Sequence, residues 1–330
     1  MRRRRVKRQE GSDMNFNIIG TGMYVPENIV TNDDMAKIVE TSDEWIRQRV
    51  GIHERRVSTG ETTSEMGYRA ALAALGNAGV SADELDLIIV STVSGESICP
   101  SMSCHIQGKL GAHCVCYDIN AACSAFLFAL EAAAGHFARG KCRKALVVGA
   151  ERLSALMDWT DRSTCVIFGD GAGAAVLEAG ENYLDSVFNV HGGSPVIKIP
   201  THIGHSPYFK GEQEKPLIMM EGQETFKYAV SAICSDIKTI MANNNLTPDD
   251  IAYIVPHQAN MRILDFASRK LGIPLDKFAV NIEKYGNTSS ASVAMALDEL
   301  NRSGKLKKGD LIVMCAFGGG LADGANLIRW

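Results

Sequence analysis

The sequence lacks a run of about eighteen uninterrupted apolar residues, which a helix needs to cross a bilayer, so we expect no membrane span and no membrane partner. No apolar stretch follows the N-terminal arginines, which argues against a secretory signal peptide. The nine cysteines include no Cys-x-x-Cys pair and follow no regular spacing. These absences predict free thiols in a reducing cytoplasm and exclude a secreted disulfide framework.

Nucleotide and metal motifs are also missing. The stretch "GDGAGA" (169–174) runs into a strand-like segment, "GTGMYVP" (20–26) meets a proline where a helix should begin, and neither has the lysine of a phosphate-binding loop. Five cysteine and histidine residues lie close together in the sequence and could suggest a zinc site: Cys104, His105, His113, Cys114 and Cys116. Their spacing fits no common zinc site, and thiols buried in the core are the simpler interpretation. We therefore expect no metal and no cofactor.

The composition indicates a globular protein, because 46% of the 330 residues are hydrophobic and 22% are charged. The first eight residues, "MRRRRVKR", hold six positive charges, so the remainder has 28 basic against 38 acidic residues. A basic arm of this kind could bind nucleic acid or anionic lipid. The simpler alternatives are a disordered leader over 1–13, or translation from Met14, and we therefore expect no nucleic-acid partner.

The chain repeats one order of helical and strand-like segments at an offset of about 165 residues. The paired segments are 62–80 with 225–246, 85–90 with 251–255, 118–133 with 285–300, and 144–151 with 310–320. Such a repeat predicts a duplicated α/β unit, with one half over 14–180 and the other over 181–330. The apolar strands alternate with amphipathic helices, which predicts parallel-type sheets covered on both faces.

Cys123 is a candidate nucleophile. It lies in "DINAACSAF" (118–126), where a strand-like run ends and a long helical pattern begins. Unpaired N–H groups and the macrodipole at a helix N-terminus favour a thiolate, so we expect Cys123 to have a lowered pKa. Its small neighbours leave room for a substrate carbonyl. Core packing is the alternative for any cysteine flanked by small residues.

The duplication should bring a histidine and an asparagine to the same cleft as Cys123. His257 follows a buried strand in "PHQAN", and Asn287 lies in the loop that corresponds to the one carrying Cys123. A core histidine and a helix-capping asparagine are the alternatives. The glycines of "FGGG" (317–320) offer backbone N–H groups to a ligand, or form only a tight turn. Together these residues favour catalysis.

The sequence resembles the thiolase superfamily, and more closely the β-ketoacyl-acyl-carrier-protein synthase III family, from about Asn15 to Trp330. Seven segments carry the resemblance: "GTGMYVPENIVTN", "TSDEWIRQRVGI", "DINAACSAF", "TDRSTCVIFGDGAGAAVL", "HQANMRI", "YGNTSSAS" and "AFGGGLADG". The resemblance implies a five-layered αβαβα fold of two similar halves and a cytoplasmic homodimer. It also implies decarboxylative condensation of an acyl-coenzyme A primer with malonyl-acyl-carrier protein, which initiates fatty-acid synthesis.

The resemblance further implies roles for individual residues. Cys123, His257 and Asn287 would form the catalytic triad, and the N–H groups of Cys123 and Gly319 would form the oxyanion hole. Trp45 and Arg162 would hold the adenine of coenzyme A, and five further residues would line its tunnel: Arg49, Gly222, Phe226, Ala259 and Asn260. A local basic patch would receive the acidic carrier protein: Lys227, Arg262, Arg269 and Lys270.

Two positions depart from the family pattern, and rival activities stay open. Cys99 stands where many relatives close the acyl pocket with phenylalanine, and the smaller side chain suggests room for a longer or branched primer. Some relatives have a tryptophan near the position of Asp323, and this sequence has none there. The first rivals are a thiolase, a hydroxymethylglutaryl-coenzyme A synthase and a polyketide starter enzyme. A thiolase would use a second cysteine in the glycine loop, and Cys315 is out of register with it. The others are a cysteine thioester hydrolase using Cys123 and His257, and a non-catalytic binding protein.

Overall fold

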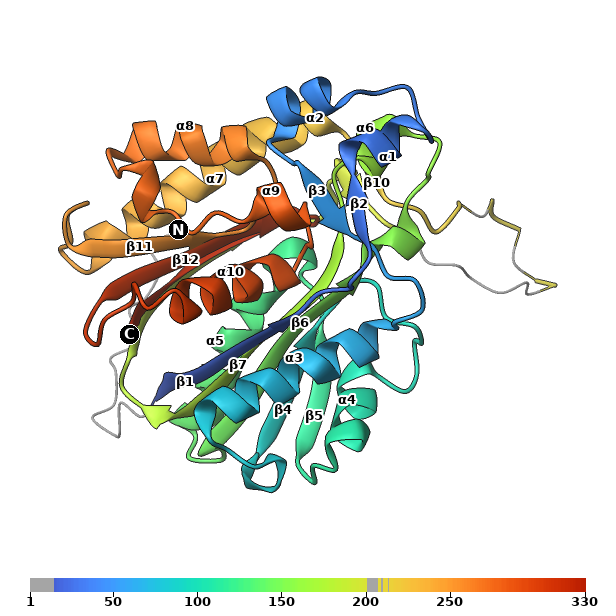
Figure 1. The fold of residues 1–330 in the computed structure, drawn as a ribbon. Coiled ribbons are helices and arrows are strands. Elements are labelled where there is room, and N and C mark those ends of the chain that lie inside the picture. Colours follow the sequence, from blue (N-terminus) through green and yellow to red (C-terminus); the bar gives the residue numbers. More distant parts are fainter. Residues whose placement is uncertain (1–14, 201–206, 209, 213) are drawn as a thin grey trace.

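The computed structural model describes residues 15–200, 207–208, 210–212 and 214–330, and the predicted leader over 1–13 lies outside them. Two β-sheets form the frame of the described chain (Figure 1). The first sheet has the strand order β1 (Asn15–Tyr24), β7 (Asp170–Gly180), β6 (Lys144–Arg152), β4 (Leu87–Ser91) and β5 (Val115–Ile119). The second has the order β11 (Ile251–Pro256), β12 (Leu311–Gly318), β13 (Ala322–Arg329) and β8 (Tyr183–Val190).

Helices cover both faces of each sheet, which gives five layers (Figure 1). The first sheet is covered outside by α3 (Thr63–Ala78) and α4 (Met102–Leu110), and the second by α7 (Gly222–Asn243) and α8 (Met261–Leu271). Between the sheets lie α5 (Ala125–Ala138) and α10 (Ala291–Arg302), whose side chains are largely buried. The predicted αβαβα fold is therefore confirmed. None of the helices in the described chain is long and apolar enough to span a bilayer.

The two sheets repeat one topology, as the sequence offset predicts. β4 runs parallel to β6 in the first sheet, and β11 runs parallel to β12 in the second. The expectation of parallel-type sheets is only half right, because β7 and β13 run antiparallel to the strands before them. β13 follows β12 after a turn of residues 319–321, too short for a parallel crossover. The predicted boundary at 180/181 falls between β7 and β8 and stays a prediction.

Glycines let the central helix α10 lie close against the first sheet. A Cβ atom on Gly173 of β7 would lie 2.6 Å from the Cβ of Ala294, and one on Gly149 of β6 would lie 2.8 Å from the carbonyl oxygen of Ser290. These separations are shorter than van der Waals contact, so any larger residue would push the helix away. The "GDGAGA" stretch therefore serves helix packing within a strand, which explains its likeness to a nucleotide motif.

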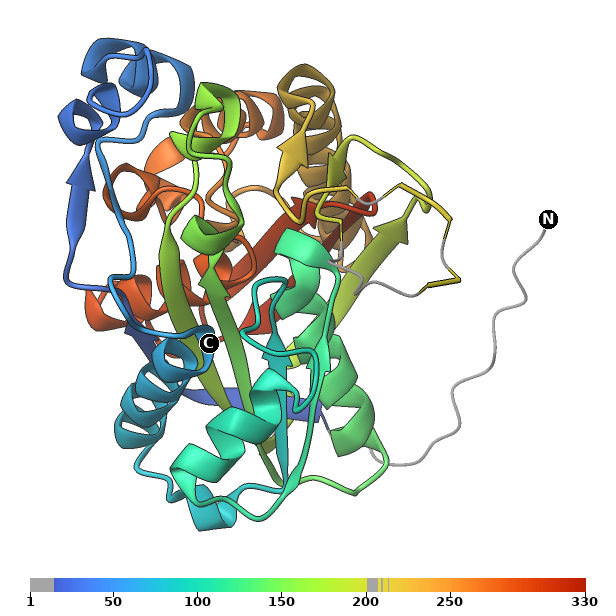
Figure 2. The same ribbon diagram turned by 90° about the vertical axis from the view of Figure 1, so that its right-hand side faces the viewer.

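Short elements cover one end of the two sheets, beside the loops that form the site (Figures 1 and 2). They are β2 (Ile29–Thr31), α1 (Asn32–Ala36), α2 (Asp43–Val50), β3 (Glu54–Arg56), α6 (Arg162–Cys165), β9 (Ile197–Lys198), β10 (Met219–Met220) and α9 (Ile282–Tyr285). The turn η2 (Ala122–Ser124) lies between β5 and α5 in the chain and contacts β12. Arg55 of β3 is 1% exposed and donates to the Val30 and Val166 carbonyls at 3.2 and 2.8 Å and to Asn32 Oδ1 at 2.9 Å. These bonds fasten the covering elements to the body of the protein.

Candidate active site

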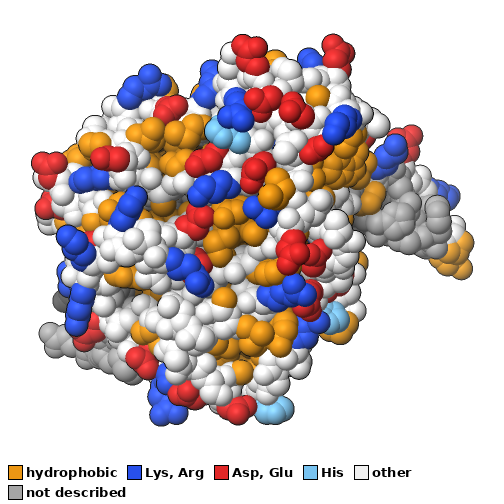
Figure 3. All heavy atoms as spheres, in the orientation of Figure 1, with side chains coloured by type: hydrophobic (Ala, Val, Ile, Leu, Met, Phe, Trp, Pro, Cys, Tyr) orange, Lys and Arg blue, Asp and Glu red, His pale blue; other side chains and the backbone are white. Residues whose placement is uncertain are grey.

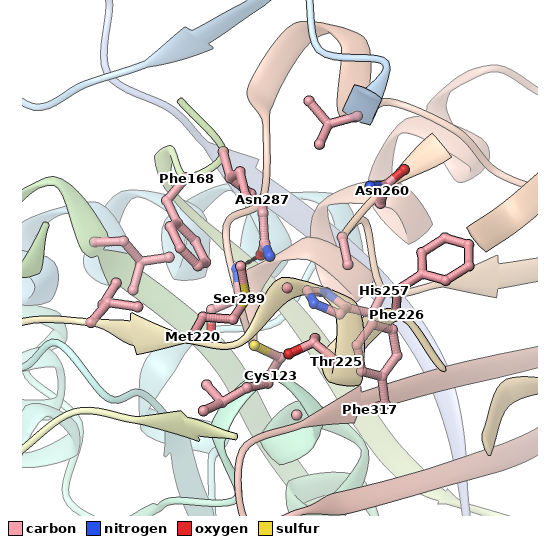
Figure 4. A pocket seen from close by; sticks show the side chains of 18 of the residues that line it. Cys123, Phe168, Met220, Thr225, Phe226, His257, Asn260, Asn287, Ser289 and Phe317 are labelled. Atoms are coloured by element: carbon pink, nitrogen blue, oxygen red, sulfur yellow. Dashed lines mark hydrogen bonds between the residues drawn. The ribbon is translucent and has the colours of Figure 1, made fainter. Parts of the chain in front are cut away.

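Loops from both halves enclose a cavity of about 210 Å³ at the end of the molecule under these short elements. Cys123, His257 and Asn287 all line it, and Figure 4 shows their side chains pointing into the same space. The rest of the wall is mostly apolar and includes Leu153, Ile167, Ile197, Ile199, Ile218 and Met220. The structure thus brings together three polar groups that the sequence separates by up to 164 residues, in surroundings that exclude most water.

The chain delivers Cys123 from the first half. β5 ends at Ile119, the turn η2 carries the cysteine, and α5 begins at Ala125. Ala122 has a φ of +48°, an unfavourable left-handed conformation for a residue with a side chain, and such strain is concentrated at functional sites. On the other side, a Cβ atom on Gly318 would lie 2.6 Å from the backbone nitrogen of Cys123. Glycine is therefore required where the end of β12 approaches the nucleophile.

The expectation of a lowered pKa for Cys123 is wrong for the unliganded site. The pKa of the Cys123 thiol is raised to about 12, chiefly by burial and also by the nearby Glu151 carboxyl group, while the neighbouring Ser289 hydroxyl offsets part of the rise. Desolvation outweighs the helix N-terminus because the sulfur lies in a cavity whose wall is mostly apolar. Cys123 is consequently a neutral thiol at neutral pH in this site.

His257 is held in a defined orientation by a neighbouring serine. The residue is 1% exposed, and burial lowers its pKa to about 3, so the imidazole is neutral. Its Nδ1 lies 2.6 Å from Ser292 Oγ, which also accepts the N–H of Gln258 at 3.3 Å. The hydroxyl proton of Ser292 is then available for Nδ1, and we infer from this arrangement that the imidazole proton is on Nε2. His257 thus presents a neutral N–H group. The ring of Phe317 packs edge-on against the imidazole, with the two ring centroids 5.3 Å apart.

Asn287 is fixed through both its backbone and its side chain. Its N–H donates to the Ile167 carbonyl at 2.9 Å, and its carbonyl accepts the N–H of Gly169 at 3.0 Å. Its side-chain Oδ1 accepts the backbone N–H of Ser289 at 2.8 Å, the bond drawn in Figure 4. The amide nitrogen is therefore left as a donor for the cavity. The N-cap residue of α10 is Ser290, which makes no side-chain cap hydrogen bond, so Asn287 does not occupy the capping position that the sequence left open.

Sequence reasoning missed a buried carboxyl group behind the nucleophile. Glu151, at the end of β6, is fully buried and accepts hydrogen bonds from Ser94 Oγ at 2.5 Å, Ser290 Oγ at 2.8 Å and the Val93 N–H at 3.1 Å. Burial raises its pKa. The sequence signal for this carboxyl group is a single acidic residue directly after the apolar run "KALVVGA" (144–150). No sequence signal pairs Ser292 with His257, because the contact joins two separate elements.

The residues expected along the coenzyme A tunnel fall into two groups. Four of them line the cavity: Gly222, Phe226, Ala259 and Asn260. The other three lie on α2 and α6 outside it, where the Arg162 guanidinium is 5.3 Å from the centroid of the Trp45 ring. A ring bound between these two side chains would have to part them. The carbonyl of Arg49 accepts a hydrogen bond from Asn260 Nδ2 at 3.1 Å, which connects the two groups.

The four residues of the expected basic patch are exposed on two packed helices. Lys227 lies on α7, and α8 carries the other three: Arg262, Arg269 and Lys270. The Arg262 guanidinium is 5.5 Å from the ring centroid of Phe226, which lines the cavity. Acidic and basic side chains are interspersed over the face drawn in Figure 3, so a positive surface on this protein has to be local.

The remaining positions singled out in the sequence have the following surroundings. Gly318, and not Gly319, lines the cavity, and a Cβ atom on Gly319 would meet the Ile197 carbonyl oxygen at 3.2 Å. Cys99 is exposed and does not line the cavity of its own chain, so its assignment to the acyl pocket stays a prediction. Cys315 is buried within β12, and burial raises its pKa. In the described part of the chain, no three His, Cys, Asp or Glu side chains are placed to hold a metal ion.

Family models and curated relatives point to the same enzyme family. Two family models match the chain: 3-oxoacyl-[acyl-carrier-protein] synthase III over residues 117–194, and the C-terminal part of the same enzyme over residues 241–330. The chain is 47% identical over 321 residues to a β-ketoacyl-[acyl-carrier-protein] synthase III of Clostridium acetobutylicum, covering 95% of this chain and 98% of that protein.

Solved structures with the same fold include two that cover nearly the whole chain. A 3-oxoacyl-[acyl-carrier-protein] synthase III from Aquifex aeolicus is 43% identical with a TM-score of 0.88, over 96% of this chain and 100% of that one. The priming β-ketosynthase of the R1128 polyketide pathway is 34% identical with a TM-score of 0.90, over 98% of both chains.

Proposed function

Because the chain belongs to the 3-oxoacyl-[acyl-carrier-protein] synthase III family, we propose that it condenses an acyl-coenzyme A primer with malonyl-acyl-carrier protein. The products are a 3-oxoacyl-carrier protein, coenzyme A and carbon dioxide, and the reaction initiates fatty-acid synthesis. The observation that carries the proposal is the convergence of Cys123, His257 and Asn287 in one apolar cavity. No metal or redox group takes part in this chemistry.

In the first half-reaction, Cys123 Sγ attacks the thioester carbonyl of the primer. The tetrahedral oxyanion is held by backbone N–H groups of Cys123 and, as the family pattern implies, Gly319. Collapse of this intermediate expels the sulfur of coenzyme A, which takes the proton that the Cys123 thiol gives up. Since Cys123 is a neutral thiol in the unliganded site, its proton has to leave as the S–C bond forms, and the departing coenzyme A sulfur is the group that finally takes it up.

In the second half-reaction, malonyl-carrier protein occupies the same cavity. The Nε2–H of His257 and the Nδ2–H of Asn287 donate hydrogen bonds to the malonyl thioester carbonyl. They stabilise the enolate that forms as carbon dioxide leaves, and each such donor contributes about 3–4 kcal/mol to the transition state. The enolate carbon attacks acyl-Cys123, a carbon–carbon bond forms, and the cysteine sulfur is released. Burial lowers the pKa of His257 to about 3, which makes the imidazole a weak proton acceptor and supports a hydrogen-bond donor in place of a general base.

The partners follow from exposed groups near the site. Trp45 and Arg162 would hold the adenine of coenzyme A, and the basic patch on α7 and α8 would dock the acidic carrier protein. A homodimer is supported by β5, which ends its sheet, and by two exposed apolar side chains, Ile98 at 88% and Val115 at 61%. The loop of Ile98 and Cys99 would then lie in that interface. A cytoplasmic location stays a proposal.

The test is a reconstituted reaction of the purified protein with malonyl-carrier protein and a panel of acyl-coenzyme A primers. We expect 3-oxoacyl-carrier protein and released carbon dioxide, measured by mass spectrometry. Formation of acetoacetyl-coenzyme A from acetyl-coenzyme A alone would indicate a thiolase, and release of free acid would indicate a hydrolase. A polyketide starter enzyme is the second candidate, favoured by the likeness to the R1128 priming ketosynthase. Activity only with a polyketide-type carrier would favour it.

A further inference from the structure

Acylation of Cys123 needs a group that accepts its proton, and the cavity wall offers no strong base. Among the described residues that line the cavity, only Cys123 and His257 titrate, and none has a carboxyl or amine group in its side chain. The pKa of the Cys123 thiol is raised to about 12, chiefly by burial, and burial lowers the pKa of His257 to about 3. The imidazole is therefore too weak a base to take the thiol proton at neutral pH, and a protein base has to lie behind the wall.

One hydroxyl group in this wall has no partner. Ser289 lines the cavity together with Cys123 (Figure 4) and is 2% exposed, and its Oγ makes no hydrogen bond within the described chain. Its φ of +49° lies in the left-handed region, which is unfavourable for a residue with a Cβ atom, and its N–H donates to Asn287 Oδ1 at 2.8 Å. Buried polar atoms without partners and strained backbone conformations both accompany functional sites.

The Ser289 hydroxyl connects the nucleophile to a buried carboxyl group. It lies close enough to the Cys123 thiol and to the Glu151 carboxyl group to offset part of the rise that burial causes in the pKa of each. Neither contact has ordinary hydrogen-bond geometry in the unliganded site, and catalytic contacts of this kind commonly tighten when substrate binds. A hydroxyl group can accept a proton from a thiol while it donates its own to a carboxylate.

One oxygen of Glu151 is fully occupied by hydrogen-bond donors. Its Oε2 accepts bonds from Ser94 Oγ at 2.5 Å, from the Val93 N–H at 3.1 Å and from Thr92 Oγ1 at 3.2 Å. The Ser94 hydroxyl itself accepts the N–H of Arg152 at 2.8 Å, and the Thr92 hydroxyl accepts the N–H of Ser94 at 3.1 Å. Both hydroxyl protons are therefore available for Oε2, which leaves no room there for a proton on the carboxyl group itself.

The other oxygen, Glu151 Oε1, is the one that can take up a proton. Its hydrogen-bond partner is Ser290 Oγ at 2.8 Å. The Ser290 hydroxyl can direct its proton to the Ser91 carbonyl at 3.1 Å instead, so that it becomes an acceptor for a protonated Oε1. The carboxyl group can thus exist in both protonation states without losing a hydrogen bond at this oxygen.

A purely structural role for Glu151 explains only part of this arrangement. The three bonds at Oε2 fasten the end of β6 to the segment 92–94, which a structural carboxyl group would also do. Such a role needs neither a second oxygen that can be protonated nor an unpaired Ser289 hydroxyl at the cavity wall. These two features fit a path for a proton between the cavity and the carboxyl group.

We propose that Ser289 and Glu151 form a relay that carries the Cys123 proton during acylation, an inference that rests on the proposed condensing function. As Cys123 Sγ bonds to the thioester carbon, its S–H bond breaks, its proton passes to Ser289 Oγ, and the Ser289 proton passes to Glu151 Oε1. The carbonyl π electrons form the oxyanion. When the bond to the coenzyme A sulfur breaks, its electron pair stays on that sulfur, and the proton returns to it through Ser289. Glu151 is then a carboxylate again, and coenzyme A leaves as a thiol.

The test is the pH dependence of acylation of the whole protein in a single turnover with acetyl-coenzyme A, measured by rapid quench and mass spectrometry. Near neutral pH, Glu151→Gln and Ser289→Ala should acylate about 10²–10⁴-fold more slowly than wild type, the usual contribution of a general base. Their rates should then rise about tenfold per pH unit without a plateau, because only the small thiolate fraction of Cys123 reacts. The wild-type rate should reach a plateau once Glu151 is ionised.

Two further variants separate the relay from effects on folding. Ser289→Gly removes the hydroxyl and suits the left-handed backbone, so it should reproduce the slow, plateau-free acylation of Ser289→Ala. The matched control is Ser124→Ala, which removes an equally buried hydroxyl next to Cys123 that donates only to the carbonyl oxygens of Ala121 and Ala322. This control should keep the wild-type rate and plateau.

The outcomes distinguish the relay from the proposed function. Acylation of Glu151→Gln or Ser289→Gly at the wild-type rate, or with the wild-type plateau, would overturn the relay and leave the condensing function standing. A loss of rate in Ser124→Ala as large as in Ser289→Gly would also overturn it, because packing would then explain the effect. A wild-type protein that takes no acyl group from acetyl-coenzyme A or any other primer would overturn the proposed function, and the relay with it.

Discussion

The orientation of His257 makes Ser292 the most informative single substitution. In Ser292→Ala, His257 Nδ1 and the Gln258 N–H lose their partner at 2.6 and 3.3 Å in a fully buried region. A buried polar group without a partner costs about 1–3 kcal/mol, and the proton is no longer directed to Nε2. We expect condensation to slow roughly 10- to 100-fold, because the imidazole loses its defined donor toward the malonyl thioester carbonyl.

The assay separates the two half-reactions and the tautomer. Acylation of Cys123 by acetyl-coenzyme A, followed by rapid-quench mass spectrometry, should change little, because it relies on backbone N–H groups. Nitrogen-15 spectra of labelled protein should show His257 protonated at Nε2 in wild type and a mixture in Ser292→Ala. The matched control is Ser290→Ala, which removes an equally buried hydroxyl bonded to Glu151 and not to His257. An unchanged condensation rate, or equal losses in both half-reactions, would refute the reasoning.

Three further predictions follow from the geometry. Asn287→Ala should leave acylation intact and reduce condensation by about 10²–10³-fold, measured as carbon dioxide release, because one enolate donor is removed. In Asp236→Asn, thermal stability should rise more at about pH 8 than at about pH 5. Burial and the neighbouring Asp323 raise the Asp236 pKa, so the folded state retains a proton that the unfolded chain releases as pH rises. This difference destabilises the wild-type fold increasingly as pH rises, and the asparagine removes it. Gly149→Ala should lower the free energy of unfolding by about 1–3 kcal/mol in a denaturant titration, because its Cβ would lie 2.8 Å from the Ser290 carbonyl oxygen.

Each of these has a contrary result. Loss of acylation in Asn287→Ala would contradict the role assigned to the amide. A stability gain in Asp236→Asn that is the same at both pH values would place the cause outside the carboxyl pair. Gly76 of α3 has open space around it, so Gly76→Ala should be tolerated where Gly149→Ala is not, and equal effects would argue against the close approach of α10.

The sequence predicted the fold through its internal repeat. Segments 85–90 and 144–151 correspond to 251–255 and 310–320, and the structure places them as β4, β6, β11 and β12. Their direction was predicted less well, because antiparallel β7 and β13 follow connections whose path is a tertiary property. The repeat also aligned Cys123 with Asn287. In the structure the helices that follow begin at Ala125 and Ala291, so the residue two positions before the second helix, which is equivalent to Cys123, is Ser289.

The candidate site was predictable in its residues and not in its electrostatics. The positions of Cys123 and His257 after apolar strands indicate loops at one edge, which local patterns can reveal. The raised pKa of Cys123 depends on the apolar side chains that enclose it, which come from distant segments. The contact of Ser292 with His257 likewise joins a helix of the centre to a strand end. Such properties arise from packing between elements, and no pattern within one segment encodes them.

The central claim is that Cys123 accepts the acyl group while His257 and Asn287 serve the step that follows. Incubation with acetyl-coenzyme A, then proteolysis and mass spectrometry, tests it most directly. We predict one acetyl group on the peptide that contains Cys123, and its disappearance when malonyl-carrier protein is added. An acetyl group on another residue, or a label on Cys123 that malonyl-carrier protein does not discharge, would contradict the account.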